Sequence, residues 1–213
     1  MIKLNKYIEH TNLNSFSTID DIEKLCLEAI RYKFKAVCVS PYYVKFAKQI
    51  LKKYDIIVCT VIGFPLGSNL IETKVVEAIK AVSDGADEID MVINISALKN
   101  REYDYIYDEI NAVVDSVQDK CVKVIVETCF LNEKEKEKIC NIVLRSNAKY
   151  IKTSTGYGKE GANVSDIILF NKILNKNKKI KASGGIKTKE QAISMINAGA
   201  SRIGTSSGVK IIK

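Results

Sequence analysis

Two lysines lie inside short apolar segments that run directly into glycine loops. Lys152 belongs to the segment Tyr150-Ile-Lys-Thr-Ser-Thr-Gly156, and Lys181 to Ile180-Lys-Ala-Ser-Gly-Gly185. A buried ammonium must find a partner or lose its proton, and two lysines in one cleft would lower each other's pKa. A neutral amine is a nucleophile toward carbonyl carbons. The pair therefore indicates carbonyl chemistry through a lysine Schiff base.

Eight short apolar segments alternate along the chain with amphipathic patterns of helical period. We predict strands at 7–10, 36–40, 56–62, 88–93, 122–127, 149–153, 180–183 and 201–205. Strands joined by crossover helices pair in parallel, and eight of them within 213 residues favour closure over an open doubly wound sheet. The predicted fold class is α/β, a (β/α)8 TIM barrel that forms a single domain over residues 1–213.

Side-chain alternation along each strand decides which residues share the interior of such a barrel. The face that carries Lys152 also carries, on neighbouring strands, Lys181, Lys123, Asp90 and Glu88. A purely structural barrel core would be apolar at these positions, so the composition indicates catalysis. For Lys123 two roles remain open, tuning the electric field of the site or a salt bridge to Glu127 or Asp90.

Two loops rich in glycine and hydroxyl groups follow the seventh and eighth predicted strands. They are Ser183-Gly-Gly185 and Gly204-Thr-Ser-Ser-Gly208. Phosphate groups in this fold tend to bind after these two strands, where backbone N–H and side-chain O–H groups donate to the oxyanion. Either loop alone has an ordinary turn as its alternative. Together they predict a phosphate site on Gly184, Gly185, Ser206 and Ser207.

The formal charge of +8 and the pI near 9.0 raise the possibility of an anionic macromolecular partner. Lysine supplies nearly all of this charge and is interleaved with glutamate, as in Glu133-Lys-Glu-Lys-Glu-Lys138. Such a pattern is typical of a solvated helix face. We therefore expect no nucleic-acid partner, and a basic, non-catalytic nucleic-acid binder remains an alternative function.

The cysteine and histidine content indicates the compartment and the absence of a metal. The six cysteines show no Cys-x-x-Cys pair, which favours a reducing cytoplasm. No segment approaches the roughly 18 apolar residues of a membrane span, and the start of the sequence has no apolar export signal, so we expect no membrane association. The single histidine, His10, cannot form a histidine cluster for zinc. We predict no metal and no cofactor, with His10 and Cys38 in packing roles.

Five motifs resemble those of the deoxyribose-phosphate aldolase family, in order and over nearly the whole chain. They are Ala36-Val-Cys-Val-Ser-Pro41, Thr60-Val-Ile-Gly-Phe-Pro-Leu-Gly67, Glu88-Ile-Asp-Met-Val-Ile-Asn94, Tyr150-Ile-Lys-Thr-Ser-Thr-Gly156 and Ile180-Lys-Ala-Ser-Gly-Gly-Ile186. The resemblance implies a class I aldolase that interconverts 2-deoxy-D-ribose 5-phosphate with D-glyceraldehyde 3-phosphate and acetaldehyde without a metal. Another phosphosugar enzyme on the same barrel, an isomerase or a transaldolase-like enzyme, is the alternative.

The same resemblance implies roles for individual residues. Lys152 matches the Schiff-base lysine, Lys181 the second lysine and Asp90 the proton-transfer carboxylate. Thr11 and Thr155 lie at positions expected to approach the substrate, as does Lys123. Family habit suggests a homodimer. The chain ends at Lys213 without the long tyrosine-terminated tail of some members, a difference that bears on the catalytic rate more than on the activity itself.

Overall fold

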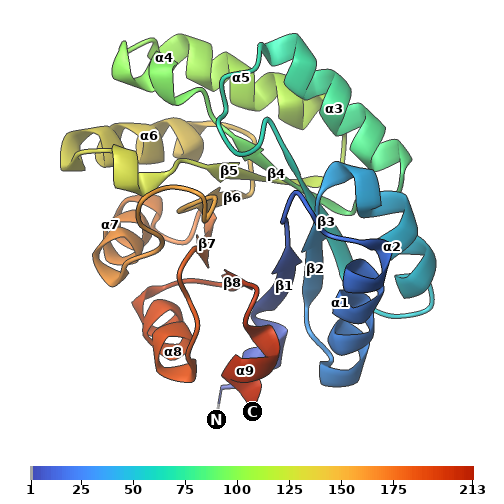
Figure 1. The fold of residues 1–213 in the computed structure, drawn as a ribbon. Helices are drawn as coiled ribbons and strands as arrows, with labels where there is room; N and C mark the ends of the chain where they lie inside the picture. The colour runs from blue at the N-terminus through green and yellow to red at the C-terminus, as the bar shows by residue number, and fades with distance from the viewer. Residues whose placement is uncertain (1) are drawn as a thin grey trace.

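The computed structural model describes residues 2–213 as a closed barrel of eight parallel strands surrounded by helices (Figure 1). The strands are β1 (Ile8–Asn12), β2 (Ala36–Val39), β3 (Ile57–Ile62), β4 (Glu88–Val92), β5 (Cys121–Ile125), β6 (Tyr150–Lys152), β7 (Lys179–Ser183) and β8 (Arg202–Thr205). Each strand pairs with the next, and β8 pairs with β1 through Ile8 and Ile203. The predicted (β/α)8 TIM barrel and its eight strands are therefore confirmed.

Helices connect the strands and cover the outside of the barrel (Figure 1). The α-helices are α1 (Ile19–Tyr32), α2 (Val44–Leu51), α3 (Ile71–Ser83), α4 (Ile95–Lys99), α5 (Tyr103–Ser116), α6 (Glu133–Arg145), α7 (Val164–Leu174), α8 (Lys189–Ala198) and α9 (Gly208–Ile212). Short 3-10 turns occur at η1 (Leu4–Lys6), η2 (Pro41–Tyr43) and η3 (Thr128–Phe130). No helix in residues 2–213 combines the length and hydropathy needed to cross a bilayer.

Local sequence signals set where several helices begin. A capping box satisfies the free N–H groups of the first turn by a reciprocal exchange between the N-cap and third residues. Such boxes begin α1, α6 and α8, formed by Thr18 with Asp21, Asn132 with Glu135, and Thr188 with Gln191. The three helix starts set where the loops after β1, β5 and β7 end.

The strands present different chemistry on their two faces. Outward residues such as Ile89, Met91 and Ile151 are fully buried against the helices and form the main apolar core. The inward face of β4 to β8 instead carries six charged side chains that are also buried, namely Glu88, Asp90, Lys123, Lys152, Lys181 and Arg202. Because charged groups are rarely buried without partners, the lumen must contain a compensating network.

Outside the lumen, one buried ion pair fixes the loop after β3. The Nζ of Lys74 donates to Glu109 Oε1 at 2.6 Å, to the Gly67 carbonyl at 2.6 Å and to the Val92 carbonyl at 2.8 Å. Glu109 Oε2 accepts from the Asn94 N–H at 2.9 Å. Burial lowers the pKa of Lys74 and raises that of Glu109. The pair thus joins the loops after β3 and β4 through α3 and α5.

Candidate active site

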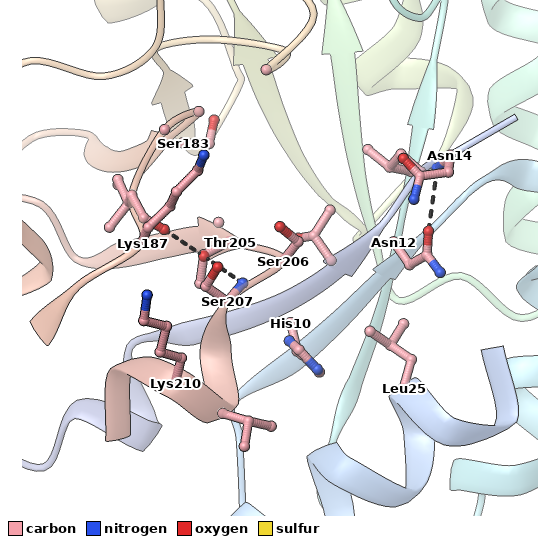
Figure 2. Close-up of a pocket in the computed structure, with 18 of the residues that line it drawn as sticks. His10, Asn12, Asn14, Leu25, Ser183, Lys187, Thr205, Ser206, Ser207 and Lys210 are labelled. Atoms are coloured by element: carbon pink, nitrogen blue, oxygen red, sulfur yellow. Dashed lines mark hydrogen bonds between the residues drawn. The ribbon is translucent and has the colours of Figure 1, made fainter. Parts of the chain in front are cut away.

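One cavity of about 1010 Å³ opens at the carboxyl ends of the strands and is lined by most of the predicted site residues (Figure 2). Those in its wall are Thr11, Lys152, Thr155, Lys181, Gly184, Gly185, Ser206 and Ser207. They come from the ends of β1, β6, β7 and β8, which is the face where sites form in this fold. Asp90 and Lys123 do not line the cavity and lie buried beneath it.

The Asp90 carboxylate lies between the lysines. Its Oδ2 accepts from Lys152 Nζ at 2.8 Å and from Lys181 Nζ at 2.5 Å, while Oδ1 accepts from Lys123 Nζ at 2.8 Å. The strand register produces this arrangement, because Lys152 is directly opposite Lys181 and Asp90 directly opposite Lys123. Of the roles left open for Lys123, the structure shows the salt bridge to Asp90. Glu127 bonds to Thr155 instead.

Two further members of this network, Glu9 and Arg202, were not predicted from the sequence. Glu9 bonds to Lys181, and its Oε2 lies 3.1 Å from Arg202 Nη1. Arg202 Nη1 also donates to Glu88 Oε2 at 3.1 Å, and Lys123 Nζ lies 2.6 Å from the same Glu88 oxygen. Strand parity could have revealed both residues, since Glu9 precedes the site residue Thr11 by two positions and Arg202 pairs with Lys181 across the sheet.

The lumen network has one more basic group than acidic groups. Its bases are Lys123, Lys152, Lys181 and Arg202, and its acids are Glu9, Glu88 and Asp90. An unbalanced charge is costly in a buried setting, so one amine is expected to be neutral. Burial, together with repulsion from Arg202, holds the pKa of Lys181 well below its usual value. Its carboxylate neighbours are each already paired with another cation.

The expected lowering of the pKa of Lys152 was wrong for the substrate-free protein. Burial would lower the pKa of this amine, but the Asp90 carboxylate outweighs burial and raises it. Burial likewise opposes ionisation of Asp90, yet Lys123 and Lys152 together lower its pKa to about 2. In the substrate-free protein the charged form of Lys152 is therefore favoured, the charged form of Lys181 is disfavoured, and Asp90 is ionised at neutral pH.

Hydrogen bonds order the two loop regions that flank the lysines. Glu127 accepts from the Thr155 N–H at 3.2 Å and from the Thr155 hydroxyl, which fixes the start of the loop after β6. Thr205 donates to the Ile186 carbonyl at 2.7 Å and accepts from the Ser207 N–H at 2.9 Å (Figure 2). These bonds hold the hydroxyl-rich loop after β8 beside the glycine loop after β7.

Four further lysines line the cavity without having been predicted as site residues. They are Lys24, Lys187, Lys210 and Lys213. Figure 2 shows Lys187 and Lys210 on either side of Thr205 and Ser207. In the sequence they look like the other solvated lysines, because they lie in loops and helices and not in apolar strands. Lys187 and Lys210, with the nearby hydroxyl groups, make the end of the cavity formed by the loops after β7 and β8 basic and suited to an anion.

His10 and the cysteines do not form a metal site. His10 Nε2 lies 2.8 Å from Glu28 Oε2, and its ring packs against Phe34 with centroids 5.2 Å apart. Donor atoms of Glu9, Cys38, Cys59 and Asp90 do lie within 4.8 Å of one another. However, the Lys123 ammonium lies 3.3 Å from Cys59 Sγ and 2.8 Å from Asp90 Oδ1, where it takes the place of a cation. Burial also raises the pKa of Cys59, which disfavours the thiolate that metal binding requires.

Comparison with known proteins gives consistent matches over nearly the full chain. A family model described as DeoC/LacD family aldolase matches residues 4–213. The deoxyribose-phosphate aldolase of Thermococcus gammatolerans is 55% identical over 212 residues, covering 98% of this chain and 94% of that protein. The deoxyribose-phosphate aldolase of Caldicellulosiruptor saccharolyticus is 53% identical over 213 residues, covering 99% and 97%.

Solved structures agree with these matches. A structure described as QR15, an aldolase, superposes with a TM-score of 0.96 at 44% identity, covering 99% of this chain and 95% of that chain. A structure described as a tetrameric deoxyribose phosphate aldolase from Aeropyrum pernix has a TM-score of 0.92 at 32% identity, covering 98% and 89%. Both similarities therefore cover almost the whole of this chain.

Proposed function

The chain belongs to the DeoC/LacD family of aldolases, and we propose that it cleaves 2-deoxy-D-ribose 5-phosphate reversibly to D-glyceraldehyde 3-phosphate and acetaldehyde. The observation that carries this proposal is the placement of Lys152 in the cavity wall, bonded at 2.8 Å to a buried carboxylate that also contacts a second lysine. In this assignment Lys152 is the Schiff-base nucleophile, Asp90 the proton carrier and Lys181 the second amine.

Activation of Lys152 requires the loss of its proton, because only the neutral amine attacks a carbonyl. Asp90 Oδ2 contacts both amines, so a proton can pass from Lys152 through this oxygen to Lys181. The low pKa of Asp90, about 2, means that the carboxylate carries the proton only in passing. Lys181 is the proposed acceptor. Because its pKa is lowered while that of Lys152 is raised, this transfer is uphill, and neutral Lys152 forms only transiently.

Neutral Lys152 then attacks C1 of the open-chain sugar to give a carbinolamine. The protonated Lys181 returns its proton to the departing hydroxyl, water leaves, and an iminium forms on Lys152. Neutral Lys181, with Asp90, is proposed to take the proton of the C3 hydroxyl as the C2–C3 bond breaks, and the iminium accepts the electron pair to become an enamine. Glyceraldehyde 3-phosphate departs, and the same proton passes to C2, which restores an iminium. One water then adds to this iminium, acetaldehyde leaves, and Lys152 returns to its charged form.

The phosphate would occupy the other end of the cavity. Gly184, Gly185, Ser206 and Ser207 lie in loops that offer backbone N–H and hydroxyl donors, with Lys187 beside them. Phosphate binding there fixes the distance between the anion and the carbonyl carbon, which brings C1 to Lys152. Thr11 and Thr155 border the space between the two ends and are proposed to contact the sugar. Lys123 acts from behind Asp90 and touches no substrate.

Reductive trapping tests this function directly. Borohydride added with 2-deoxyribose 5-phosphate should leave an N-ethyl group or the reduced sugar on Lys152, identified by peptide mass spectrometry. The Lys152→Met variant should show no adduct and no acetaldehyde release, whereas Lys179→Met, which alters an exposed lysine of the adjacent strand, should keep both. An adduct on another lysine, or cleavage by Lys152→Met, would contradict the assignment.

Assembly and location are further parts of the proposal. We propose that the chain forms a homodimer in the cytoplasm. The tetrameric relative from Aeropyrum pernix supports self-association, and all six cysteines are free, as is usual in a reducing compartment. Light scattering coupled to size-exclusion chromatography would decide between one, two and four copies.

A further inference from the structure

Tyr157 lies at the mouth of the cavity and is bonded across it. It belongs to the loop between β6 and α7, five residues after Lys152. Its hydroxyl donates to the carbonyl of Leu13, in the loop after β1, at 2.7 Å. Its own N–H donates to Thr155 Oγ1 at 3.0 Å, and Thr155 is held in turn by Glu127. The tyrosine is thus anchored at its backbone and at its hydroxyl, although 54% of its surface is exposed.

Three side chains from three different loops meet at this place. The Tyr157 ring packs edge-on against Phe64, with centroids 5.4 Å apart and an interplanar angle of 89°. Phe64 and Leu13 pack in turn against the buried cluster of Cys38, Cys59 and Val61. We call Leu13, Phe64 and Tyr157 the roof. Edge-to-face aromatic pairs and buried apolar contacts stabilise such an arrangement beyond the single hydrogen bond.

The loop that carries Tyr157 also packs against the proposed phosphate loop. The Ala162 N–H lies 3.1 Å from both the Ser183 and Gly184 carbonyls. Gly161 approaches Gly184 so closely that a Cβ on Gly161 would lie 2.2 Å from the Gly184 carbonyl oxygen. The loop is therefore fixed at both ends, and the position of the Tyr157 ring between them is well defined.

The two ends of the cavity differ in polarity. Lysines and hydroxyl groups surround the end formed by the loops after β7 and β8. Leu13 and Tyr157 are the apolar side chains that the loops after β1 and β6 contribute to its wall. A substrate with its phosphate at the basic end and C1 on Lys152 would have C2, which becomes the enamine carbon, beside Lys152 in the same cavity that Leu13 and Tyr157 line. Any substituent on C2 would have to fit beneath it.

We propose that Tyr157 is a specificity-determining residue, which latches the loop after β6 to Leu13 so that the roof admits only a two-carbon donor aldehyde. This inference rests on the proposed aldolase function. Removing the ring should open space for one extra methyl group on C2, as in propanal. A single methylene is typically worth about 10-fold or more in discrimination within a close-fitting pocket.

Two variants separate the effect of the hydrogen bond between Tyr157 and Leu13, which we call the latch, from the effect of the Tyr157 ring. Tyr157→Phe keeps the ring and removes the bond to Leu13, and Tyr157→Ala removes both. Tyr54→Phe is the matched control, because Tyr54 is 50% exposed and lies before β3, at the opposite end of the barrel. For each protein we would measure the rate of aldol addition of propanal and of acetaldehyde to glyceraldehyde 3-phosphate. Hydrogen exchange would be followed by mass spectrometry in peptides that cover 11–16 and 153–162.

The expected result is a propanal-to-acetaldehyde rate ratio raised about 10-fold in Tyr157→Ala and less in Tyr157→Phe, with faster exchange in both peptides for both variants. Tyr54→Phe should match the wild type. An unchanged ratio in both Tyr157 variants would overturn the specificity role, even if exchange increased. Failure of the wild-type protein to release acetaldehyde from deoxyribose 5-phosphate would instead contradict the proposed function, and the exchange measurement would still test the latch.

Discussion

Lys152 and Lys181 donate to the same oxygen, Oδ2 of Asp90, at 2.8 and 2.5 Å. The two lysines are directly opposite each other on β6 and β7, so backbone pairing, not loop flexibility, sets the distance between their amines. A shared acceptor gives a proton a path of two hydrogen bonds from one amine to the other.

Replacing Asp90 with asparagine should interrupt proton transfer. The amide keeps the size of the side chain but cannot accept and release a proton, and general acid–base catalysis contributes about 10²- to 10⁴-fold. We expect kcat to fall within that range and the borohydride adduct on Lys152 to form correspondingly slowly. Asp115→Asn, at an exposed position of α5, is the control and should leave kcat unchanged. Full activity in Asp90→Asn would remove the carboxylate from the mechanism.

Replacing Lys181 with leucine should shift imine formation to higher pH. Lys152 carries a raised pKa in the substrate-free protein, and Lys181 is the base that receives its proton. Without that base, Lys152 must lose its proton to solvent, so the acidic limb of the pH–rate profile should move upward. Each pH unit of displacement corresponds to about a 10-fold loss of rate on that limb. An unmoved profile for borohydride trapping would contradict the relay.

The network that makes this chemistry possible was only partly predictable from the sequence. Strand parity brought Lys152, Lys181 and Asp90 to one face, because the two-residue period of a strand is visible in any apolar segment. Parity could also have placed Glu9 and Arg202 on this face, but it does not show which inward side chains pair, and neither residue was predicted although both strands were. For the same reason the sequence could not show which amine lies against a carboxylate, and the pKa of Lys152 was expected to shift in the wrong direction.

The overall fold could be predicted from the sequence more completely than the surroundings of the site. Capping signals and alternating periods are local, and they predicted all eight strands with ends that differ by a few residues. The largest differences lie at the carboxyl ends of β1 and β5, and Glu127, which the prediction placed in the fifth strand, has a positive φ of 51°. Lys187 and Lys210 were missed because a lysine in a loop has the same sequence pattern whether it faces solvent or a cavity.

Protonation of Asp90 should weaken the fold in acid. The pKa of Asp90 is lowered from 3.8 to about 2, so its contribution to stability is complete above pH 4 and is lost as the pH falls toward 2. The shift corresponds to about 2 kcal/mol. Urea unfolding of the wild type and of Asp90→Asn at pH 7, 4 and 3 would measure it. The difference in the free energy of unfolding between the wild type and Asp90→Asn should shrink as the pH falls. A difference that stays constant with pH would contradict this interpretation.

Phosphate recognition should depend on Lys187. Removal of a charge-assisted hydrogen bond costs about 1.5–3 kcal/mol, so Lys187→Met should raise KM for deoxyribose 5-phosphate about 10- to 100-fold. Cleavage of unphosphorylated 2-deoxyribose should be nearly unaffected. The exposed Lys189, two residues further along, does not line the cavity, and Lys189→Met serves as the control. An equal loss for both sugars would place Lys187 elsewhere in the reaction.

The Lys74–Glu109 pair should matter for stability far more than a surface pair. Both side chains are fully buried, and breaking such a pair leaves an uncompensated charge, which costs about 3–5 kcal/mol. Lys74→Met should therefore lower the free energy of unfolding by that amount. Lys80→Met, which breaks an exposed pair with Asp84, should change it by less than about 1 kcal/mol. Comparable losses in the two variants would argue against a structural role for Lys74.

The single excess base in the lumen has a consequence for the whole catalytic cycle. In the proposed mechanism one positive charge moves between the two amines. Before substrate binds, it is on Lys152. During attack it resides on Lys181, and after water leaves it returns to Lys152 as the iminium. The surrounding residues Glu9, Lys123 and Arg202 therefore experience the same total charge at each of these stages. A rigid, desolvated ionic lattice can thus remain in place throughout imine formation, with no counter-ion to bring in and no water to rearrange.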